Sequence, residues 1–484
     1  MNRIIKENGL SVEIKASVVY IFASLLSKGL AIVTVPIFTR LMSTEQMGIV
    51  NLFNSWQSTL GAIASLSLTS GGYMVAMREY EESRDEYMSS VLTLTSIIAS
   101  IMILIYIIDH AFWELVLGLP TSTIILMLLN FFLSPATDFW LARQRYEYKY
   151  VATGIITIIS SILASIVSVI AVILASNLHV ESLGIVRLFS SYIVTLGMAM
   201  VLWIFIMLKG KTFVNKIYWQ FSLRLSIPLV GNSIAMQVLN VSDRIMISKI
   251  VGNSAVGIYG VLYTVSSISL IVWNAINSSF VPFLFENIEN ESGIQIIKKT
   301  STQLMAAYGT IAVGITLIAP EIVQILATKE YYEAIYIMPP IAAGIFFTSI
   351  SNMYSNVLIY YRKTQYVMIS SGIAALINVI LNYFCIEIWG YMAAAYTTLI
   401  AYIILAILQA IISRKIYRKV VRSEKQTVYN DKGVLVLSMI IVASCLGCLP
   451  LYFNTGFRYC IIVSMIIIGM IFRKKLMSIL NLRR

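Results

Sequence analysis

Charged residues are scarce in this chain. Asp, Glu, Lys and Arg make up 12% of its 484 residues, whereas 58% are apolar. Soluble globular proteins usually carry about twice this charged fraction. The composition therefore excludes a soluble globule and places the chain in a lipid bilayer. Histidine and cysteine are also rare, with 2 and 4 residues.

The rare residues form no catalytic or metal-binding pattern. Cys445 and Cys448 make a CxxC pair, but no second pair and no polar ligand lies near it in the sequence. We therefore expect packing rather than metal or redox chemistry. An acidic metal motif and a long outer loop are missing as well. The sequence thus predicts a protein that is not an enzyme and that needs no cofactor.

Apolar stretches long enough to cross a membrane recur along the whole chain. A spanning helix needs about 20 mostly apolar residues, and about 14 such stretches can be counted. The sequence therefore predicts an all-α polytopic membrane protein. The stretches are residues 16–39, 48–70, 88–108, 112–133, 151–176, 184–208, 221–247, 255–283, 301–327, 335–360, 366–386, 391–413, 433–453 and 456–472.

The positive charges predict how these helices are oriented. Lys and Arg are retained on the cytoplasmic side of short loops. If the N-terminus is cytoplasmic, the inner segments hold 28 of the 35 Lys and Arg residues and the outer loops hold six. Both termini are therefore expected in the cytoplasm. This bias also accounts for most of the net charge of +12, so no nucleic-acid partner is expected.

Two segments of the sequence, residues 24–53 and 233–262, look alike at a distance of 209 positions. Arg40 and Lys249, for example, are each followed by Gly-Ile after seven intervening residues. Parallel repeats in a polytopic chain are typical of transporters, in which two similar bundles move about a shared cavity. Weaker matches continue the pattern: Gln144 with Arg362 and Tyr148 with Tyr366, 218 positions apart, and Gly184 with Gly390, 206 positions apart.

The repeat predicts how the chain is divided. We expect two six-helix lobes related by the parallel repeat, followed by two further helices. The expected parts are an N-terminal lobe at 1–215, a C-terminal lobe at 216–413, a basic cytoplasmic connector at 414–432, and the last two helices with a basic tail at 433–484.

Polar residues recur at steps of three and four within the predicted helices, so they share one helix face. Ser24 lies on such a face in the first helix, Gln237 and Asn240 lie on the equivalent face of the seventh, and Asn274 lies in the eighth. Such faces are costly to expose to lipid. Helix packing accounts for a single serine, but stripes in several repeat-related helices indicate a hydrated cavity.

Lys28 is the charge with the most informative position. It lies twelve residues into the first helix, and an ionisable group near the middle of a bilayer costs several kcal/mol. A deep cation suits an anionic substrate, although snorkelling or a partner carboxylate would also explain it. Arg224, at the inner mouth of the seventh helix, is a weaker candidate because it can lie at the interface.

Two carboxylates give further candidates. Asp243 and Arg244 stand together toward the outer end of the seventh helix, where they either meet substrate or form a self-contained pair. Asp138 lies near the inner end of the fourth helix, where it either lines the cavity or pairs with Arg143 or Lys149.

Several longer segments carry a recognisable pattern. They are SKGLAIVTVPIFTRLMSTEQMGIVNLF at 27–53, IPLVGNSIAMQVLNVSDRIMISKIVGNSAVGIYGVLY at 227–263, and EIVQILATKEYYEAIYIMPP at 321–340, followed by IYYRKTQY at 359–366. The most specific parts are the DR-I-x-I segment at 243–247 and Gly-Ile-Tyr at 257–259. In these segments the chain resembles the polysaccharide-biosynthesis flippases of the multidrug/oligosaccharidyl-lipid/polysaccharide exporter superfamily.

The resemblance implies a transporter of the bacterial inner membrane. Such a protein moves undecaprenyl-pyrophosphate-linked oligosaccharide repeat units to the outer leaflet, for O-antigen, capsule or exopolysaccharide assembly. It alternates between inward-open and outward-open states of two six-helix lobes. Its expected partners are the lipid-linked oligosaccharide, membrane lipids and other polysaccharide-assembly proteins, and we expect a monomer. The membrane potential is worth about 2.3 kcal/mol per charge per 100 mV, so a proton or sodium gradient could drive transport without a recognisable site.

Two related functions remain open. A peptidoglycan-precursor flippase shares the 14-helix design and a cationic cavity, so substrate assays are needed to separate it. A cation-coupled multidrug exporter is expected to place an acidic residue near the first helix, where this chain has Lys28. The residues expected to bind substrate are Lys28, Arg244, Asp243, Arg224, Asp138, Ser24, Gln237, Asn240 and Asn274.

The predicted orientation can be tested by cysteine labelling in intact cells. With the four native cysteines replaced by serine, Lys329→Cys should react with a membrane-impermeant thiol reagent, because residue 329 is expected outside. Val420→Cys should stay unlabelled until the cells are opened. Labelling at 420 but not at 329 in intact cells would reverse the topology.

Overall fold

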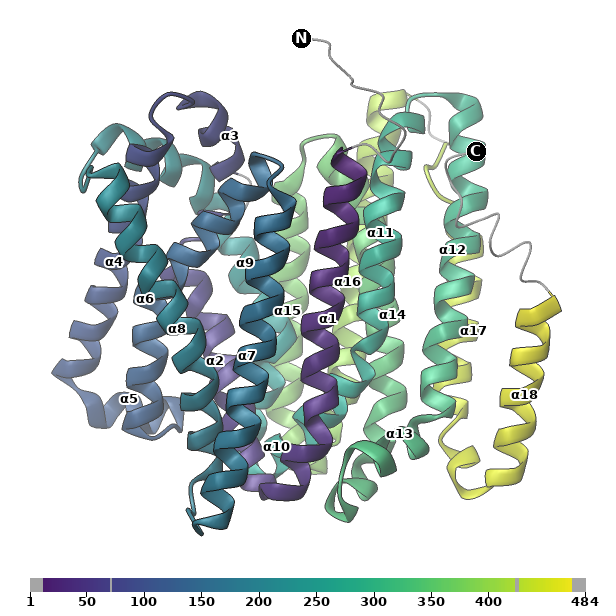
Figure 1. Ribbon diagram of the computed structural model, residues 1–484. Coiled ribbons are helices and arrows are strands. Elements are labelled where there is room, and N and C mark those ends of the chain that lie inside the picture. Colours follow the sequence, from purple (N-terminus) through teal and green to yellow (C-terminus); the bar gives the residue numbers. More distant parts are fainter. Residues whose placement is uncertain (1–11, 70–71, 423–425, 472–484) are drawn as a thin grey trace. The chain divides into compact units, whose positions relative to one another are not determined.

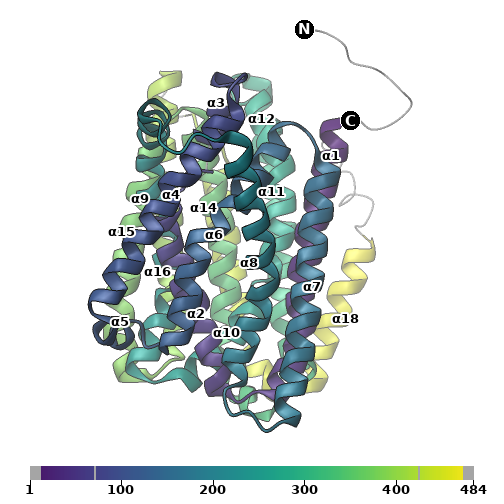
Figure 2. The ribbon, with the colours of Figure 1, turned by 60° about the vertical axis from the view of Figure 1, so that its left-hand side comes forward.

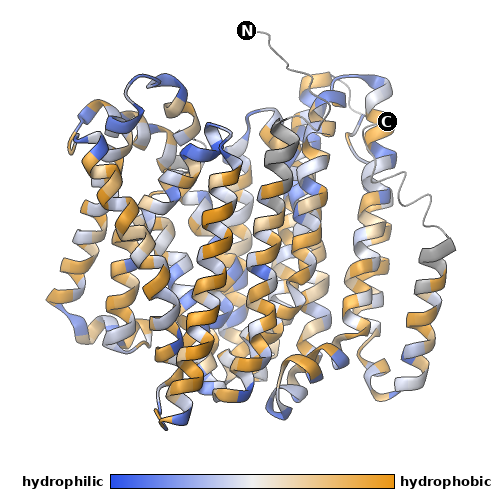
Figure 3. Ribbon diagram, in the orientation of Figure 1, coloured by the Kyte–Doolittle hydropathy of each residue, from blue (hydrophilic) through white to orange (hydrophobic). Residues whose placement is uncertain are grey.

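The computed structural model describes residues 12–69, 72–422 and 426–471, and within these ranges the regular elements are all helical (Figure 1). In this part of the chain, ten helices are long and apolar enough to cross a membrane, or up to twelve if each of two bent pairs is one span. Apolar residues run along these helices (Figure 3). The prediction of an all-α, multi-pass membrane protein is confirmed.

The chain divides into two compact units, Met1–Gln237 and Val238–Arg484. The division falls inside α9 (Lys216–Ile250). The four predicted parts, with boundaries at 215/216, 413/414 and 432/433, remain a prediction.

The described residues of the first unit form eight helices and the beginning of α9. They are α1 (Val12–Leu41), α2 (Thr44–Ala64), α3 (Gly72–Glu79), α4 (Arg84–Ile108), α5 (His110–Leu117), α6 (Thr121–Tyr146), α7 (Tyr150–Asn177) and α8 (Leu183–Gly210). Within this unit α1 packs on α7, α7 packs on α8, and α6 packs on both α4 and α8. Figure 2 shows α7 alongside α1. The Ser27 and Ser161 hydroxyls, 2.7 Å apart, hydrogen-bond across the α1–α7 contact.

The second unit is built around α14, whose residues are largely buried. Packed on α14 are α12, α16 and α17. Within the core of this unit the Tyr308 ring stacks on Phe346, and the Trp273 ring contacts Tyr308 in a tilted arrangement. Its elements after α9 are α10 (Asn253–Ser266), α11 (Ile268–Asn287), α12 (Glu291–Leu317), α13 (Ala319–Leu326), the 3-10 helix η1 (Lys329–Ile337), α14 (Met338–Tyr360), α15 (Thr364–Trp389), α16 (Ala393–Val421), α17 (Asp431–Gly447), the 3-10 helix η2 (Pro450–Phe453) and α18 (Thr455–Ile471).

Within the described residues, the predicted spans fall largely on helical structure, but several of them are broken. The stretch at 221–247 bends by 45° within α9. The stretch at 112–133 is interrupted at Gly118, whose φ of 64° ends α5. The stretch at 255–283 breaks between α10 and α11, and the stretch at 301–327 bends by 58° between α12 and α13. The count of 14 is therefore approximate. α2 is not among the ten apolar spans, because polar side chains interrupt its sequence.

The helix boundaries correct part of the predicted repeat. α1 and α9 end 209 positions apart, as do the starts of α2 and α10. The turns after α6 and α14 have left-handed residues at Tyr148 and Arg362, which are 214 positions apart rather than the 218 of the sequence match. Gly184 and Gly390 are not equivalent, because Gly184 opens α8 whereas Gly390 follows the end of α15.

Two glycines of α8 allow a matched test of packing in the first unit. A Cβ at Gly184 would lie 2.7 Å from the Gln46 carbonyl oxygen, whereas nothing lies within 4 Å of a Cβ at Gly197. We expect Gly184→Ala to lower the free energy of unfolding by about 1–3 kcal/mol through overpacking. Gly197→Ala should raise it by up to about 1 kcal/mol, since alanine favours the helix. Thermal unfolding of the purified protein measures both, and equal effects would contradict the close approach of α2 and α8.

Candidate functional site

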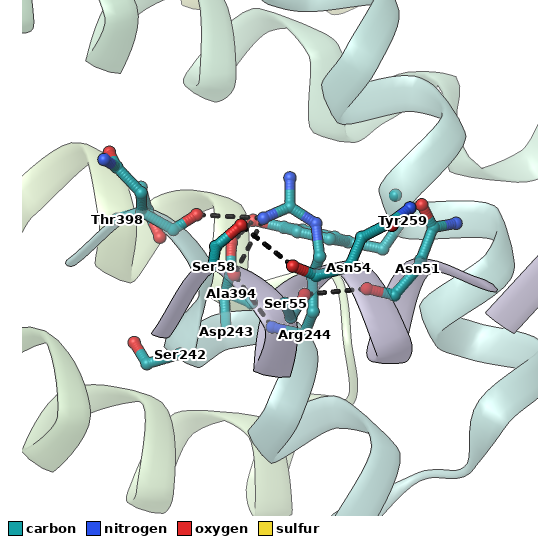
Figure 4. Close-up of polar contacts among 12 residues, drawn as sticks. Asn51, Asn54, Ser55, Ser58, Ser242, Asp243, Arg244, Tyr259, Ala394 and Thr398 are labelled. Carbon is teal, nitrogen blue, oxygen red and sulfur yellow. Dashed lines mark hydrogen bonds and ion pairs between the residues drawn. The ribbon is translucent and has the colours of Figure 1, made fainter. Parts of the chain in front are cut away.

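A buried ion pair stands in the part of α9 that belongs to the second unit. The side chains of Asp243 and Arg244 are 1% and 10% exposed, and Arg244 Nη1 lies 3.6 Å from Asp243 Oδ1. The same Nη1 donates to the Asn240 carbonyl oxygen at 2.9 Å. Figure 4 shows Asp243 and Arg244 next to each other, and the Arg244 backbone N–H donates to Asp243 Oδ1 at 2.8 Å. The pair is therefore held by its own helix.

Tyrosines complete the surroundings of this pair. The Tyr259 hydroxyl donates to Asp243 Oδ2 at 2.6 Å, and the Arg244 guanidinium lies 4.2 Å from the centre of the Tyr263 ring. The Tyr402 hydroxyl donates to Asn240 Oδ1 at 2.6 Å. The two most specific sequence segments, at 243–247 and 257–259, thus meet in one buried hydrogen bond. These contacts give Asp243, Arg244 and Asn240 protein partners.

Next to the ion pair, α9, α15 and α16 share an uncharged hydrogen-bond network that the sequence did not point out. Ser242 donates to Asn378 Oδ1 at 2.9 Å, and Asn382 Nδ2 donates to the same oxygen at 3.1 Å. Thr397 donates to Asn382 Oδ1, and Asn378 Nδ2 donates to Thr398 at 3.4 Å. The sequence did contain a signal for this network, because Asn378 and Asn382 are four positions apart in an apolar helix and therefore share one helix face.

In the first unit, the side chain of Lys28 is exposed, unlike the buried Asp243–Arg244 pair. It is exposed on α1, as are Ser24 and Ala31 on the same face. No carboxylate pairs with Lys28 anywhere in the described ranges, so the partner-carboxylate explanation finds no support there. Ser27 instead faces α7. Lys28 is thus a cation within an apolar span that the described chain leaves unneutralised.

The polar side of α2 lies in the same unit. Ser55 and Ser58 donate to the carbonyl oxygens of Asn51 and Asn54 at 2.8 and 2.9 Å (Figure 4). These hydroxyls are therefore satisfied within the helix. The Asn51 amide nitrogen, by contrast, is buried without a hydrogen-bond partner among the described residues, so it remains available to water or a ligand.

Asp138 opens onto a small polar cavity in the first unit. The cavity, of about 200 Å³, lies between α2 and α6 and is also lined by Gln57, Ser58, Asn130 and Ser134. Asp138 is exposed, and Gln57 Oε1 is buried without a hydrogen-bond partner in the described part of the chain. The cavity therefore offers oxygen acceptors with unused capacity.

The alternative that Asp138 pairs with Arg143 or Lys149 is wrong. Arg143 instead contacts Asp85, and it donates to Glu147 at 2.9 Å. Lys149 also donates to Glu147, at 2.5 Å. Burial alone would raise the pKa of Glu147, but the hydrogen bonds from Lys149 and Arg143 outweigh it and lower this pKa. Glu147, in the turn after α6, thus pairs with both of the cations that were the alternative partners of Asp138.

The remaining predicted residues lie on α9 and α11, and no hydrogen bond joins them to one another in the described part of the chain. Arg224 and Asn274 are exposed, and Gln237 is half-buried. Within the described residues, no group of three or more His, Cys, Asp or Glu side chains could hold a metal ion. The predicted substrate residues therefore fall into two kinds, those that protein groups satisfy and those that stay open.

The buried pair can be tested as a structural element. We expect Arg244→Ala to lower the free energy of unfolding by about 3–5 kcal/mol, because it leaves the Asp243 carboxylate buried without its cation. The double variant Asp243→Ala, Arg244→Ala should lose less, since no charge is stranded. Thermal unfolding and abundance in the membrane measure both. Normal stability of Arg244→Ala with lost transport would instead make Arg244 a substrate ligand.

The sequence and the fold were compared with known proteins. The profile of the family described as polysaccharide biosynthesis protein matches residues 14–288, which is more than half of the chain, and the MatE profile matches residues 228–384. No curated protein matches the sequence significantly.

Solved structures with a similar fold are also transporters. The chain is similar to lipid II flippase MurJ in an inward closed conformation, with a TM-score of 0.64, 16% identity, and coverage of 96% of this chain and 100% of that one. It is also similar to a multidrug resistance MATE family transporter of the MOP superfamily in its inward-facing conformation, with a TM-score of 0.58, 13% identity, and coverage of 82% and 96%. At such identities these structures show the fold. The profile match over more than half of its length shows that the chain belongs to the polysaccharide biosynthesis protein family.

Proposed function

We propose that this protein flips undecaprenyl-pyrophosphate-linked oligosaccharide repeat units from the inner to the outer leaflet by alternating access, for assembly of O-antigen, capsule or another surface polysaccharide. The observation that carries the proposal is Lys28, an exposed cation in an apolar span without a carboxylate partner in the described chain. The family match supports a lipid-linked substrate.

The headgroup of such a substrate explains why one open cation is useful. A pyrophosphate cannot cross hydrocarbon unaided, because its charges lose their hydration. A lysine can replace part of that hydration through charge-assisted hydrogen bonds. A flippase must also release its cargo, and a dense group of cations would hold the anion too long. Lys28, with Ser24 one turn before it on the exposed face, gives a weak and reversible anion site.

The sugars of the substrate need a different surface. Their hydroxyl groups both donate and accept hydrogen bonds, so amides and carboxylates suit them. The unpaired Asn51 amide nitrogen and Gln57 oxygen, together with Asp138, supply such groups in the unit that carries Lys28. The polyprenyl tail carries no polar group and stays in lipid or along an apolar helix surface.

A second candidate function is a cation-coupled drug exporter, and Asp138 is the observation that favours it. An unpaired carboxylate at a polar cavity within a span can take up a proton or a metal cation. A peptidoglycan-precursor flippase is a third candidate, because its substrate carries the same pyrophosphate headgroup. The three differ in the compound that accumulates when the protein fails.

The role of Lys28 can be tested in cells that lack their own copy of the gene. Lys28→Ala should abolish export of the lipid-linked repeat unit while the protein stays inserted and abundant. Lys28→Arg should retain part of the activity, because charge matters more than shape for a headgroup with many oxygens. Surface polysaccharide and accumulated lipid-linked oligosaccharide are measured together with protein abundance.

Each outcome of this experiment separates the candidates. Normal export by abundant Lys28→Ala protein would end the proposed role of Lys28. Loss of dye resistance in Asp138→Asn, with surface polysaccharide unchanged, would favour the drug exporter. Accumulation of peptidoglycan precursor in the null strain would favour the third candidate.

A further inference from the structure

A dense group of cations surrounds a cavity in the second unit that the proposed transport does not use. The cavity, of about 720 Å³, lies where α12 and α17 begin and α16 ends. Five cations line it together with one carboxylate, Asp431; the cations are Lys298, Lys299, Arg414, Arg418 and Lys432. We call it the basic pocket.

Most of this positive charge is not neutralised by protein. Arg414 Nη2 lies 2.7 Å from Asp431 Oδ2. The other four cations form no ion pair with the described residues. Converging like charges are unfavourable unless an anion lies between them. The basic pocket is therefore suited to an anionic group.

An apolar groove of about 510 Å³ adjoins the basic pocket and shares Arg414 and Asp431 with it. The groove runs between α14, α16 and α17, and its lining includes Ile407, Ala410 and Leu435. Ile407 is 49% exposed and Leu435 is 60% exposed, so the groove opens to the surface of the unit. Its surface is suited to a hydrocarbon chain.

The junction between the pocket and the groove is fixed in place. Asp431 takes the Arg414 ion pair on one oxygen, and it accepts a hydrogen bond from the Tyr354 hydroxyl at 2.8 Å on the other. These three side chains come from α14, α16 and α17. A charged pocket and an apolar groove thus lie side by side, as the charged headgroup and the apolar tail of a lipid do.

We propose that this composite site binds an anionic glycerophospholipid of the bilayer, with its phosphate in the basic pocket and an acyl chain in the apolar groove. Basic pockets between membrane helices are suited to anionic lipid headgroups. A resident lipid fits better than a transported one, because five cations favour retention whereas a flippase needs release. The proposal does not depend on the transported substrate.

Two double charge variants give a matched test. Lys298→Gln with Arg418→Gln removes two cations of the basic pocket. Lys415→Gln with Lys419→Gln removes two exposed cations of α16 that do not line it. Binding of phosphatidylglycerol and phosphatidylcholine to the purified full-length protein is measured by native mass spectrometry. Thermal unfolding in phosphatidylcholine checks that both variants fold.

We expect the pocket variant to lose about 30-fold in phosphatidylglycerol affinity, from about 1 kcal/mol for each cation. The control variant should lose less than about threefold, and phosphatidylcholine binding should not change in either. Equal losses in the two variants would mean diffuse surface attraction and would overturn the proposal.

Two further probes test the lipid part of the claim. Ala410→Trp, which fills the groove, should weaken phosphatidylglycerol binding, and inorganic pyrophosphate should compete poorly because it has no acyl chain. Unchanged lipid binding in Ala410→Trp, or pyrophosphate binding as tight as that of the lipid, would overturn the proposal. Tighter binding of undecaprenyl pyrophosphate than of phosphatidylglycerol at this pocket would overturn it as well, in favour of a substrate site.

Discussion

Hydrocarbon offers no hydrogen-bond partner to a polar group, and this constraint organises the whole chain. Backbone groups are satisfied inside helices, and the side chains that remain polar must find protein, water or ligand. Most do find protein: the Ser55 hydroxyl bonds its own helix, Ser27 meets Ser161, and Asp243 accepts from Tyr259. The groups left without such partners are therefore the informative ones.

The charged residues within the spans fall into two groups, those with protein partners and those without. Asp243 and Arg244 are buried and paired with each other, and Asp243 also accepts hydrogen bonds from Tyr259 and from the Arg244 backbone, which is the arrangement of a structural pair. Lys28 and Asp138 are exposed and form no ion pair in the described ranges. Near the helix ends, the basic pocket brings together more positive charge than its one carboxylate can neutralise. A single open cation suits a cargo that must leave, and a cluster of cations suits a ligand that stays.

Periodicity and composition were enough for the helical class, the approximate spans and the boundary between α1 and α2, because these depend on local sequence. The breaks at Gly118 and between α12 and α13 were missed, since an apolar run does not reveal where its helix bends. The alternative pairing of Asp138 with Arg143 was wrong, because Arg143 contacts Asp85, which is far from it in the sequence but close to it in the fold. The Ser242–Asn378 bond joins residues 136 positions apart, so it required tertiary packing to be seen. The repeat and the substrate residues remain predictions.

The central claim is that the unpaired polar groups face water whereas the satisfied ones face protein. Cysteine accessibility in native membranes tests this directly, because hydrophilic thiol reagents need water to react. In a background without native cysteines, Lys28→Cys and Asp138→Cys should be modified, and Tyr259→Cys should not. Pyrophosphate-bearing lipid should protect position 28. An unreactive Lys28→Cys, in a protein that is folded and abundant, would place this residue against lipid or protein and would contradict the account.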